Sequence, residues 1–187
     1  NLLNQLPRDI ILVLDGAYAE YVIKDDYDSG FSLVEEFENI IITRTFSKVY
    51  GLAGLRIGWC YASEKIVNIL NKVKGPFNTQ SISQEIAIIA LEDKEYVKKI
   101  VKNNYQVKRW FEDELKILNI NTHPSEGNFS FIQTTAEKAE EITTHLMNEG
   151  IIVRQLDSYR LPHCIRITIG TKEEMQATLQ SLKKILI

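Results

Sequence analysis

The sequence lacks the features that mark several large classes of protein. Of its 187 residues only two are cysteines, Cys60 and Cys164, far apart and outside any CxxC spacing, so neither a zinc site nor a disulfide framework is indicated. No apolar run approaches the roughly 18 residues of a membrane span. The 22 basic and 25 acidic residues leave a net charge of -3 and form no long basic run, so neither nucleic acid nor a membrane is expected as a partner.

The sequence also begins at Asn1, without an initiator methionine or a signal peptide, and we therefore expect it to be a piece of a longer protein. Both cysteines stand in apolar runs, which favours buried free thiols and fits a reducing cytoplasm. His123, His145 and His163 share no ligand spacing, so no metal site is expected.

What is present is an ordinary globular composition, with 44% hydrophobic and 25% charged residues. Residues 10–14, 40–43 and 55–61 are short, apolar and rich in β-branched side chains. They barely alternate, which is typical of strands covered on both faces in a parallel sheet. The polar stretch between the first two runs is long enough for a crossover connection.

Helices are predicted after the third run. Ser63 is expected to cap a helix that stops at Gly75, and Ser81 with Gln84 fits a capping box for the next helix. A long helix is predicted from about residue 96 to residue 118, because its apolar side chains share one face.

The last part of the chain changes to a small strand-helix-strand-strand-helix pattern. Strands are predicted at residues 128–133, 151–154 and 164–169, and a helix at 136–148. Thr171 and Glu174 fit a capping box for a final helix. The fold class is therefore α/β: part of a mainly parallel sheet in residues 1–94, then a long connecting helix and a small C-terminal α/β domain in residues 95–187.

The most unusual segment runs from Ser47 to Gly58 and reads SKVYGLAGLRIG. Its glycines allow tight turns and close approach to a ligand, while a hydroxyl, an ammonium and a guanidinium are suited to hold a phosphate. It lacks the order of a P-loop. By residue types alone, a glycine-bearing surface turn is the alternative.

This segment resembles the lysine motif of fold-type I pyridoxal-phosphate-dependent aminotransferases, S-K-x-x-G-L-A-G-x-R-x-G. The resemblance implies that Lys48 binds the cofactor as a Schiff base and then moves protons in catalysis. It implies also that Ser47 and Arg56 bind the cofactor phosphate.

An Asp-x-x-Tyr element precedes the lysine by 33 residues, counted from 15 to 48, as in that family. By resemblance, Asp15 pairs with the pyridine nitrogen of the cofactor and Tyr18 donates to its 3′ oxygen. An aspartate at the end of a buried strand stands where α/β proteins form ligand sites, although a turn cap is the alternative role.

Two arginines suit substrate anions. By resemblance, Arg166 binds the α-carboxylate, and Arg154, in Gly-Ile-Ile-Val-Arg, matches the substrate-phosphate arginine of histidinol-phosphate aminotransferases. Asn128 resembles a family residue near the substrate. The alternatives are solvent-facing strand arginines and a turn asparagine.

The resemblance thus implies a homodimeric aminotransferase of histidine biosynthesis that uses histidinol phosphate and 2-oxoglutarate. An aromatic-amino-acid aminotransferase, a threonine-phosphate decarboxylase-like enzyme and an inactive, self-associating remnant are the alternatives. Relatives carry cofactor-binding elements upstream, among them a Gly/Ser-rich loop, that this sequence lacks. We therefore expect the 187-residue chain alone to bind the cofactor poorly, to be inactive and to associate.

Overall fold

A computed structural model of the chain describes residues 2–186. The chain divides into two compact units between residues 98 and 99, close to the boundary expected after residue 94. This division falls inside helix α5 (Lys94–Ile117), which begins two residues before its expected start. None of the helices in the described part of the chain is long and apolar enough to cross a membrane.

The first unit is built on a three-stranded sheet in the order β1-β2-β3, with β1 at Leu12–Asp15, β2 at Ile40–Thr45 and β3 at Gly58–Ala62. Strands β1 and β2 are parallel, and the turn η1 (Ala19–Tyr21) and helix α2 (Phe31–Glu36) lie in the connection between them. The predicted crossover is therefore confirmed.

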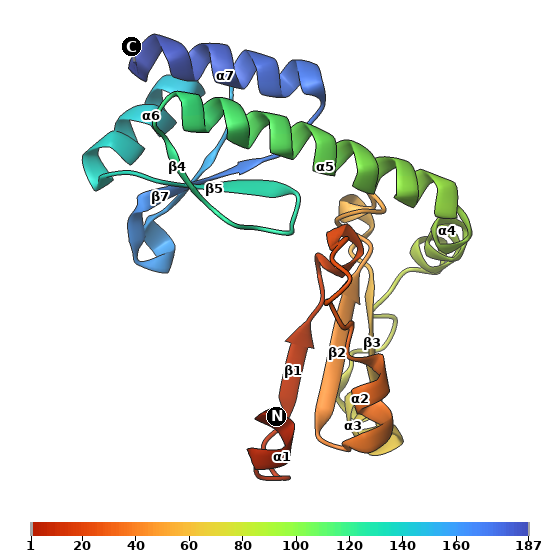
Figure 1. Cartoon of the computed structure of the whole chain (residues 1–187). Helices are drawn as coiled ribbons and strands as arrows, with labels where there is room; N and C mark the ends of the chain where they lie inside the picture. The colour runs from red at the N-terminus through yellow and green to blue at the C-terminus, as the bar shows by residue number, and fades with distance from the viewer. Residues whose placement is uncertain (1, 187) are drawn as a thin grey trace. The chain divides into compact units, whose positions relative to one another are not determined.

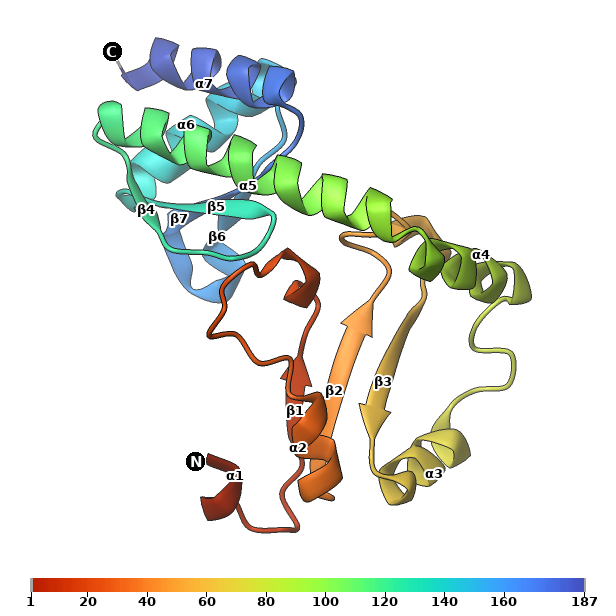
Figure 2. The same cartoon turned by 45° about the vertical axis from the view of Figure 1, so that its right-hand side comes forward.

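The direction predicted for the third strand is wrong, because β3 runs antiparallel to β2, as the arrows in Figure 2 show. The connection between them is one loop, closed where the Phe46 N–H donates to the Ile57 carbonyl at 3.2 Å. A parallel pair needs a crossover, usually a helix, whereas a loop that returns along the same edge leaves the strands antiparallel. The strand also starts later than predicted, since Ala53–Leu55 forms the 3-10 turn η2.

Strand β3 is largely exposed, which corrects the expectation for one of the cysteines. Cys60 is exposed on β3, whereas Cys164 is buried, and both are free thiols. Burial raises the pKa of the Cys164 thiol. The first unit has a small core cluster of Leu3, Val34, Ile40 and Ile42, and further apolar side chains such as Phe46 and Val49 are buried outside it.

Two of the predicted helix caps differ in the structure. Helix α3 (Glu64–Val73) starts after Ser63 as predicted, but the Ser63 hydroxyl donates to the Glu38 carbonyl at 3.0 Å and makes no cap bond. Helix α4 (Ser81–Glu92) has Gln80 at its N-cap, so Ser81 already lies inside the helix and the predicted capping box does not form.

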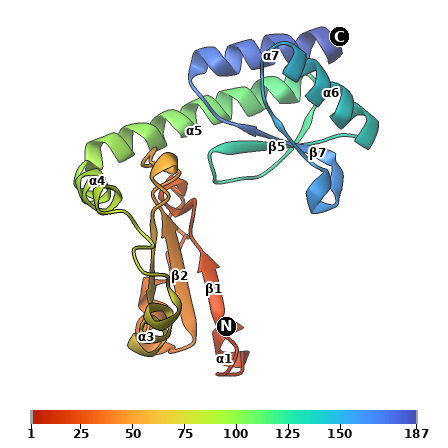
Figure 3. The same cartoon turned by 180° about the vertical axis from the view of Figure 1, so that it is seen from behind.

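The second unit has a four-stranded antiparallel sheet in the order β4-β5-β7-β6. The strands are β4 at Asn121–His123, β5 at Phe129–Gln133, β6 at Arg154–Leu156 and β7 at Leu161–Thr168. Helices α5, α6 (Ala136–Asn148) and α7 (Lys172–Leu186) contribute to one core with β5 and β7, and Figures 1 and 3 show α6 and α7 on the same side of the sheet. The fully buried side chains of this core include Phe111, Leu115, Leu146, Ile165 and Leu182.

Most of the pattern predicted for this unit is confirmed. The Thr171 N–H donates to Glu174 Oε2 at 2.7 Å and the Glu174 N–H donates to Thr171 Oγ1 at 3.2 Å, so this capping box forms. The strand predicted at 151–154 instead begins at its last residue, because the Ile151 N–H donates to the Leu146 carbonyl and closes the end of α6. Strand β4 was not predicted.

Candidate active site

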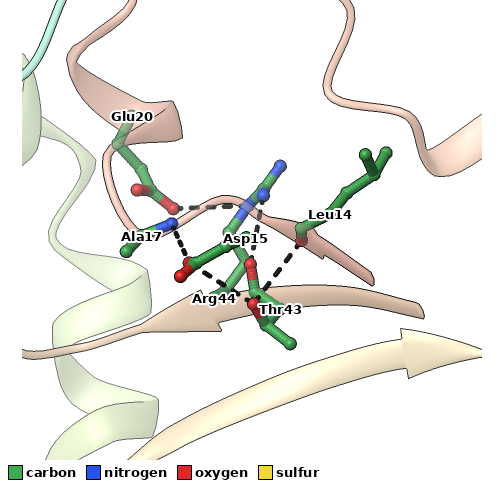
Figure 4. A network of polar contacts seen from close by, with 6 residues as sticks. All are labelled: Leu14, Asp15, Ala17, Glu20, Thr43 and Arg44. Carbon is green, nitrogen blue, oxygen red and sulfur yellow. Dashed lines mark hydrogen bonds and ion pairs between the residues drawn. The ribbon is translucent and has the colours of Figure 1, made fainter. Parts of the chain in front are cut away.

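The candidate site begins where β1 and β2 end. Asp15 is the last residue of β1, pairs in register with Thr43 of β2 and is exposed. Its Oδ1 accepts from the Ala17 N–H at 3.1 Å and from the Thr43 hydroxyl at 3.5 Å (Figure 4). The carboxylate thus caps the turn after β1 and also lies at the carboxyl edge of two parallel strands, where α/β folds form ligand sites.

Tyr18 and Lys48 come to the same edge from the two strands. Tyr18 stands three residues after the end of β1, just before η1, and Lys48 stands three residues after the end of β2. Both side chains are half-buried, and Lys48 Nζ lies 5.2 Å from the centre of the Tyr18 ring. A carboxylate, a phenol and an ammonium therefore gather at this edge.

Ser47 and Arg56 are the first and last residues inside the neck of the loop between β2 and β3. The Ser47 N–H donates to the Thr45 hydroxyl oxygen at 3.0 Å. Arg56 is in the left-handed region, at φ 51°, is exposed, and donates from Nη1 to the Ala53 carbonyl at 2.8 Å. The two sides of the neck therefore carry a hydroxyl, on Ser47, and an exposed guanidinium, on Arg56.

The loop itself depends on glycine at one position. Gly51 has φ +70°, and its N–H donates to the Lys48 carbonyl at 2.9 Å. A side chain at that φ is strained, and a Cβ would also lie 3.3 Å from the Tyr96 hydroxyl oxygen. The backbone conformation of the turn directly after Lys48 therefore favours glycine at position 51.

Arg44 and Glu20 were not predicted from the sequence. The Arg44 side chain is only 5% exposed, and its Nε lies 3.7 Å from Glu20 Oε1 (Figure 4). Burial raises the pKa of the Glu20 carboxyl, and a backbone hydrogen bond and the Arg44 charge oppose that rise. A signal was present in the sequence, because Arg44 follows Ile40 and Ile42 at a spacing of two and so falls on the buried face of β2.

The three predicted substrate-binding residues lie in the second unit. Arg154 on β6 and Arg166 on β7 are directly opposite each other in register. Arg154 is exposed, whereas Arg166 is half-buried, and its guanidinium carbon lies 5.5 Å from the centre of the Phe129 ring. Asn128 immediately precedes that phenylalanine, and its carbonyl accepts from the Ile169 N–H at 2.8 Å.

The arginine pair occupies the sheet face opposite the core. Ile165 and Ile167, which flank Arg166 on β7, belong to the core cluster, so the arginine points the other way. Arg166 Nε is buried and has no hydrogen-bond partner within residues 2–186. An anion would satisfy such a donor.

The family follows from a comparison with known proteins. The model of the family "Aminotransferase class I and II" matches residues 2–182. The chain belongs to this family. Among curated members, histidinol-phosphate aminotransferase of Cereibacter sphaeroides is 44% identical over 166 residues, which cover 88% of this chain and 45% of that protein. That of Granulibacter bethesdensis is 44% identical over 179 residues, which cover 95% and 48%.

Similar solved structures confirm the predicted fold class. Histidinol-phosphate aminotransferase of Sinorhizobium meliloti, solved in complex with pyridoxal-5′-phosphate, has a TM-score of 0.90 and 30% identity over 98% of this chain and 50% of that protein. The L-threonine-O-3-phosphate decarboxylase of Porphyromonas gingivalis has a TM-score of 0.80 at 23% identity, over 99% of this chain and 57% of that chain, a likeness of fold alone. The chain spans about half the length of the curated relatives it matches.

Proposed function

We propose that the protein carrying this chain is a pyridoxal-phosphate-dependent aminotransferase that moves an amino group between histidinol phosphate and 2-oxoglutarate in histidine biosynthesis. The observation that carries the proposal is the Lys48 ammonium beside the Tyr18 ring, at the edge where Asp15 ends β1. Family membership and the curated relatives named histidinol-phosphate aminotransferase support it.

The donor set of the first unit matches the polar groups of this cofactor. Lys48 carries the amine that reacts with an aldehyde, and Asp15 offers a carboxylate to a protonated ring nitrogen. Tyr18 offers a hydroxyl to the ring oxygen, and Ser47 with Arg56 offers donors to the phosphate. The half-buried Lys48 and the exposed Asp15 and Arg56 leave these groups accessible to a ligand at this edge.

Each residue then has a separate task. Lys48 Nζ holds the cofactor and afterwards takes the proton from the substrate Cα. The Asp15 carboxylate keeps the ring nitrogen protonated, and Ser47 and Arg56 fix the phosphate end so that the ring stays in place. When bound, pyridoxal phosphate supplies the electron sink for the charge that develops at Cα.

The two arginines of the second unit supply the substrate-binding part of the proposal. Arg166, with its buried Nε, is suited to bind the α-carboxylate of glutamate and 2-oxoglutarate as a planar fork. Arg154 lies opposite it in register and is exposed, which suits a second anion such as the phosphate of histidinol phosphate. Asn128 is assigned to the same substrate region.

A homodimer located in the cytoplasm completes the proposal. Helix α4 exposes Ile82, Ile88 and Ile89, apolar surface that a second copy would cover. The free thiols Cys60 and Cys164 are compatible with a reducing compartment.

The test of substrate choice compares kcat/KM of the full protein and of its Arg154→Ala variant. The substrates are histidinol phosphate, an aromatic amino acid and threonine phosphate, and Lys102→Ala, at an exposed position of α5, is the control. We expect histidinol phosphate to be preferred, and Arg154→Ala to reduce that preference by about 1.5–3 kcal/mol, the value of a hydrogen bond to a charged group. An equal loss on every substrate would remove the support that Arg154 gives to a phosphorylated amine.

A further inference from the structure

Arg44 lies on the buried face of β2, directly under the turn that follows Asp15. Its Nη1 donates to the Thr43 carbonyl at 3.3 Å, and its guanidinium carbon lies 5.0 Å from the centre of the Phe31 ring. The Gly16 N–H donates to the same Thr43 carbonyl at 3.0 Å, so one acceptor holds both the arginine and the turn. A Cβ on Gly16 would overlap the guanidinium, which shows how closely the turn packs on Arg44.

The same arginine also reaches the far end of this turn, through Glu20. Glu20 lies in η1, and its Oε1 is 3.7 Å from Arg44 Nε (Figure 4). Burial and the charge of Glu20 raise the pKa of Tyr50, two residues beyond Lys48, and the charge of Arg44 opposes that rise. Arg44 therefore contacts the turn on both sides of Tyr18, at Gly16 and at Glu20.

Asp15 is held differently. It is paired in the β1–β2 ladder, and its own carboxylate closes the turn through the Ala17 N–H. Tyr18, by contrast, lies outside the ladder, and its neighbours Ala19 and Tyr21 donate to the carbonyls of Gly16 and Tyr18 at 3.1 and 3.0 Å. Loss of the arginine should therefore loosen Tyr18 more than Asp15.

We infer that Arg44 and Glu20 form a positioning pair that fixes Tyr18 beside Lys48. The pair does not touch the reacting atoms; it acts through the turn between Gly16 and Glu20. The part of the inference that concerns the cofactor rests on the proposed function, whereas the part that concerns the turn does not. We expect that lysine cannot replace arginine at position 44, because one planar guanidinium contacts the Thr43 carbonyl and the Glu20 carboxylate at once.

The first experiment needs no cofactor and follows hydrogen exchange in the full protein. Arg44→Lys keeps the charge and loses the planar fork, and Arg8→Lys on the exposed N-terminal segment is the matched control. We expect amide exchange in residues 19–22 to accelerate on the order of tenfold in Arg44→Lys, with no change in helix α6. An unchanged rate in residues 19–22 would overturn the inference.

The second experiment adds pyridoxal phosphate and measures the pH midpoint at which the absorbance of the bound chromophore changes. We expect Arg44→Lys to move the midpoint in the same direction as Tyr18→Phe, and the double variant to move it no further than Tyr18→Phe alone. Additive shifts, or no shift in Arg44→Lys, would mean that Arg44 does not act through Tyr18. If the unaltered protein fails to bind the cofactor at Lys48, the proposed function fails, and the exchange experiment still tests the turn.

A paired apolar variant separates positioning from stability. Removing Arg44 alone leaves the half-buried Glu20 carboxylate without its counter-charge, and the buried Glu20 Oε2 already has no hydrogen-bond partner in the described part of the chain. The double variant Arg44→Met with Glu20→Leu removes both charges. We expect its melting temperature to be higher than that of Arg44→Met alone and close to that of the parent, while its absorbance midpoint stays displaced from that of the parent. Recovery of both would make the pair purely structural and would overturn the inference.

Discussion

The two units of the chain differ in what their side chains do. In the second unit, three helices and the sheet share one core, and Phe111, Leu115 and Leu182 are fully buried. The first unit has a four-residue core cluster and leaves large apolar side chains exposed, among them Val13 at 54% and Ile89 at 65%. It nevertheless carries all the residues assigned to the cofactor. The residues assigned to the cofactor therefore lie in the unit that buries less of its own apolar surface.

A physical reason links these two properties. A ligand edge needs accessible polar groups at strand ends, so Asp15 and Arg56 are exposed and Lys48 is only half-buried. In the second unit, helices pack over one face of the sheet, and the apolar core between them stabilises this unit. The comparison predicts that substitutions in the first unit change activity more than stability, and that core substitutions in the second unit do the reverse.

The largest expected effect is on activity in the first unit. Lys48→Ala should bring transamination by the full protein below detection, because no other amine is assigned to the cofactor, while the melting temperature stays close to that of the parent. Lys65→Ala, on the exposed side of α3, is the control and should keep full activity. Turnover in Lys48→Ala would refute the assignment of the lysine.

The largest expected effect on stability is in the second unit. Phe111→Ala should lower the free energy of unfolding by about 3–5 kcal/mol, because it leaves a cavity in a closely packed core. Val73→Ala, at the exposed end of α3, should change it by less than about 0.5 kcal/mol. Urea denaturation measures both, and similar losses would erase the contrast between the units.

Asp15→Asn should reduce kcat on the order of 100-fold without unfolding the protein. Asparagine keeps the side-chain oxygen that accepts from the Ala17 N–H, so the turn is preserved while the charge is lost. Asp25→Asn, in the exposed loop after η1, is the matched control. Near-normal kcat in Asp15→Asn would make this aspartate a turn cap and nothing more.

The smallest effect is expected at the capping box of α7. Thr171→Ala should cost about 1 kcal/mol of unfolding free energy, because the Glu174 N–H loses its acceptor. Gln176→Ala, exposed in the same helix, should be neutral or slightly stabilising. Thermal unfolding of the two variants distinguishes a cap effect from a change in helix propensity.

The sequence predicted the elements that have local signals. Helix α6 begins and ends at the predicted residues, with Gly150 at φ +80° after it, as a helix terminator should be. The direction of β3 was not predictable from its nearly continuous apolar run, because that pattern is typical of a covered strand and does not fix the direction in which the strand pairs. Strand β4 has only three residues, Asn-Thr-His, which carry no apolar alternation.

The candidate site was predicted in part. The sequence showed that Asp15 and Lys48 each follow a predicted strand. Because parallel strands bring their carboxyl ends to one edge of the sheet, the two residues could be expected at the same edge. The pairing of Arg44 with Glu20 was not predictable from the sequence. A charged residue at a buried strand position indicates that a partner is needed, but not which of the distant acidic residues supplies it. The roles of the site residues, and the expected weakness of the isolated chain toward the cofactor, stay predictions.

Borohydride reduction of the full protein in the presence of pyridoxal phosphate, with the modified peptide mapped by mass spectrometry, tests most directly whether Lys48 holds the cofactor. We expect a single pyridoxyl group on Lys48, lost in Lys48→Ala and retained in Arg154→Ala. A label on Lys24 or Lys65, or no saturable label at all, would contradict the central claim that this lysine holds the cofactor.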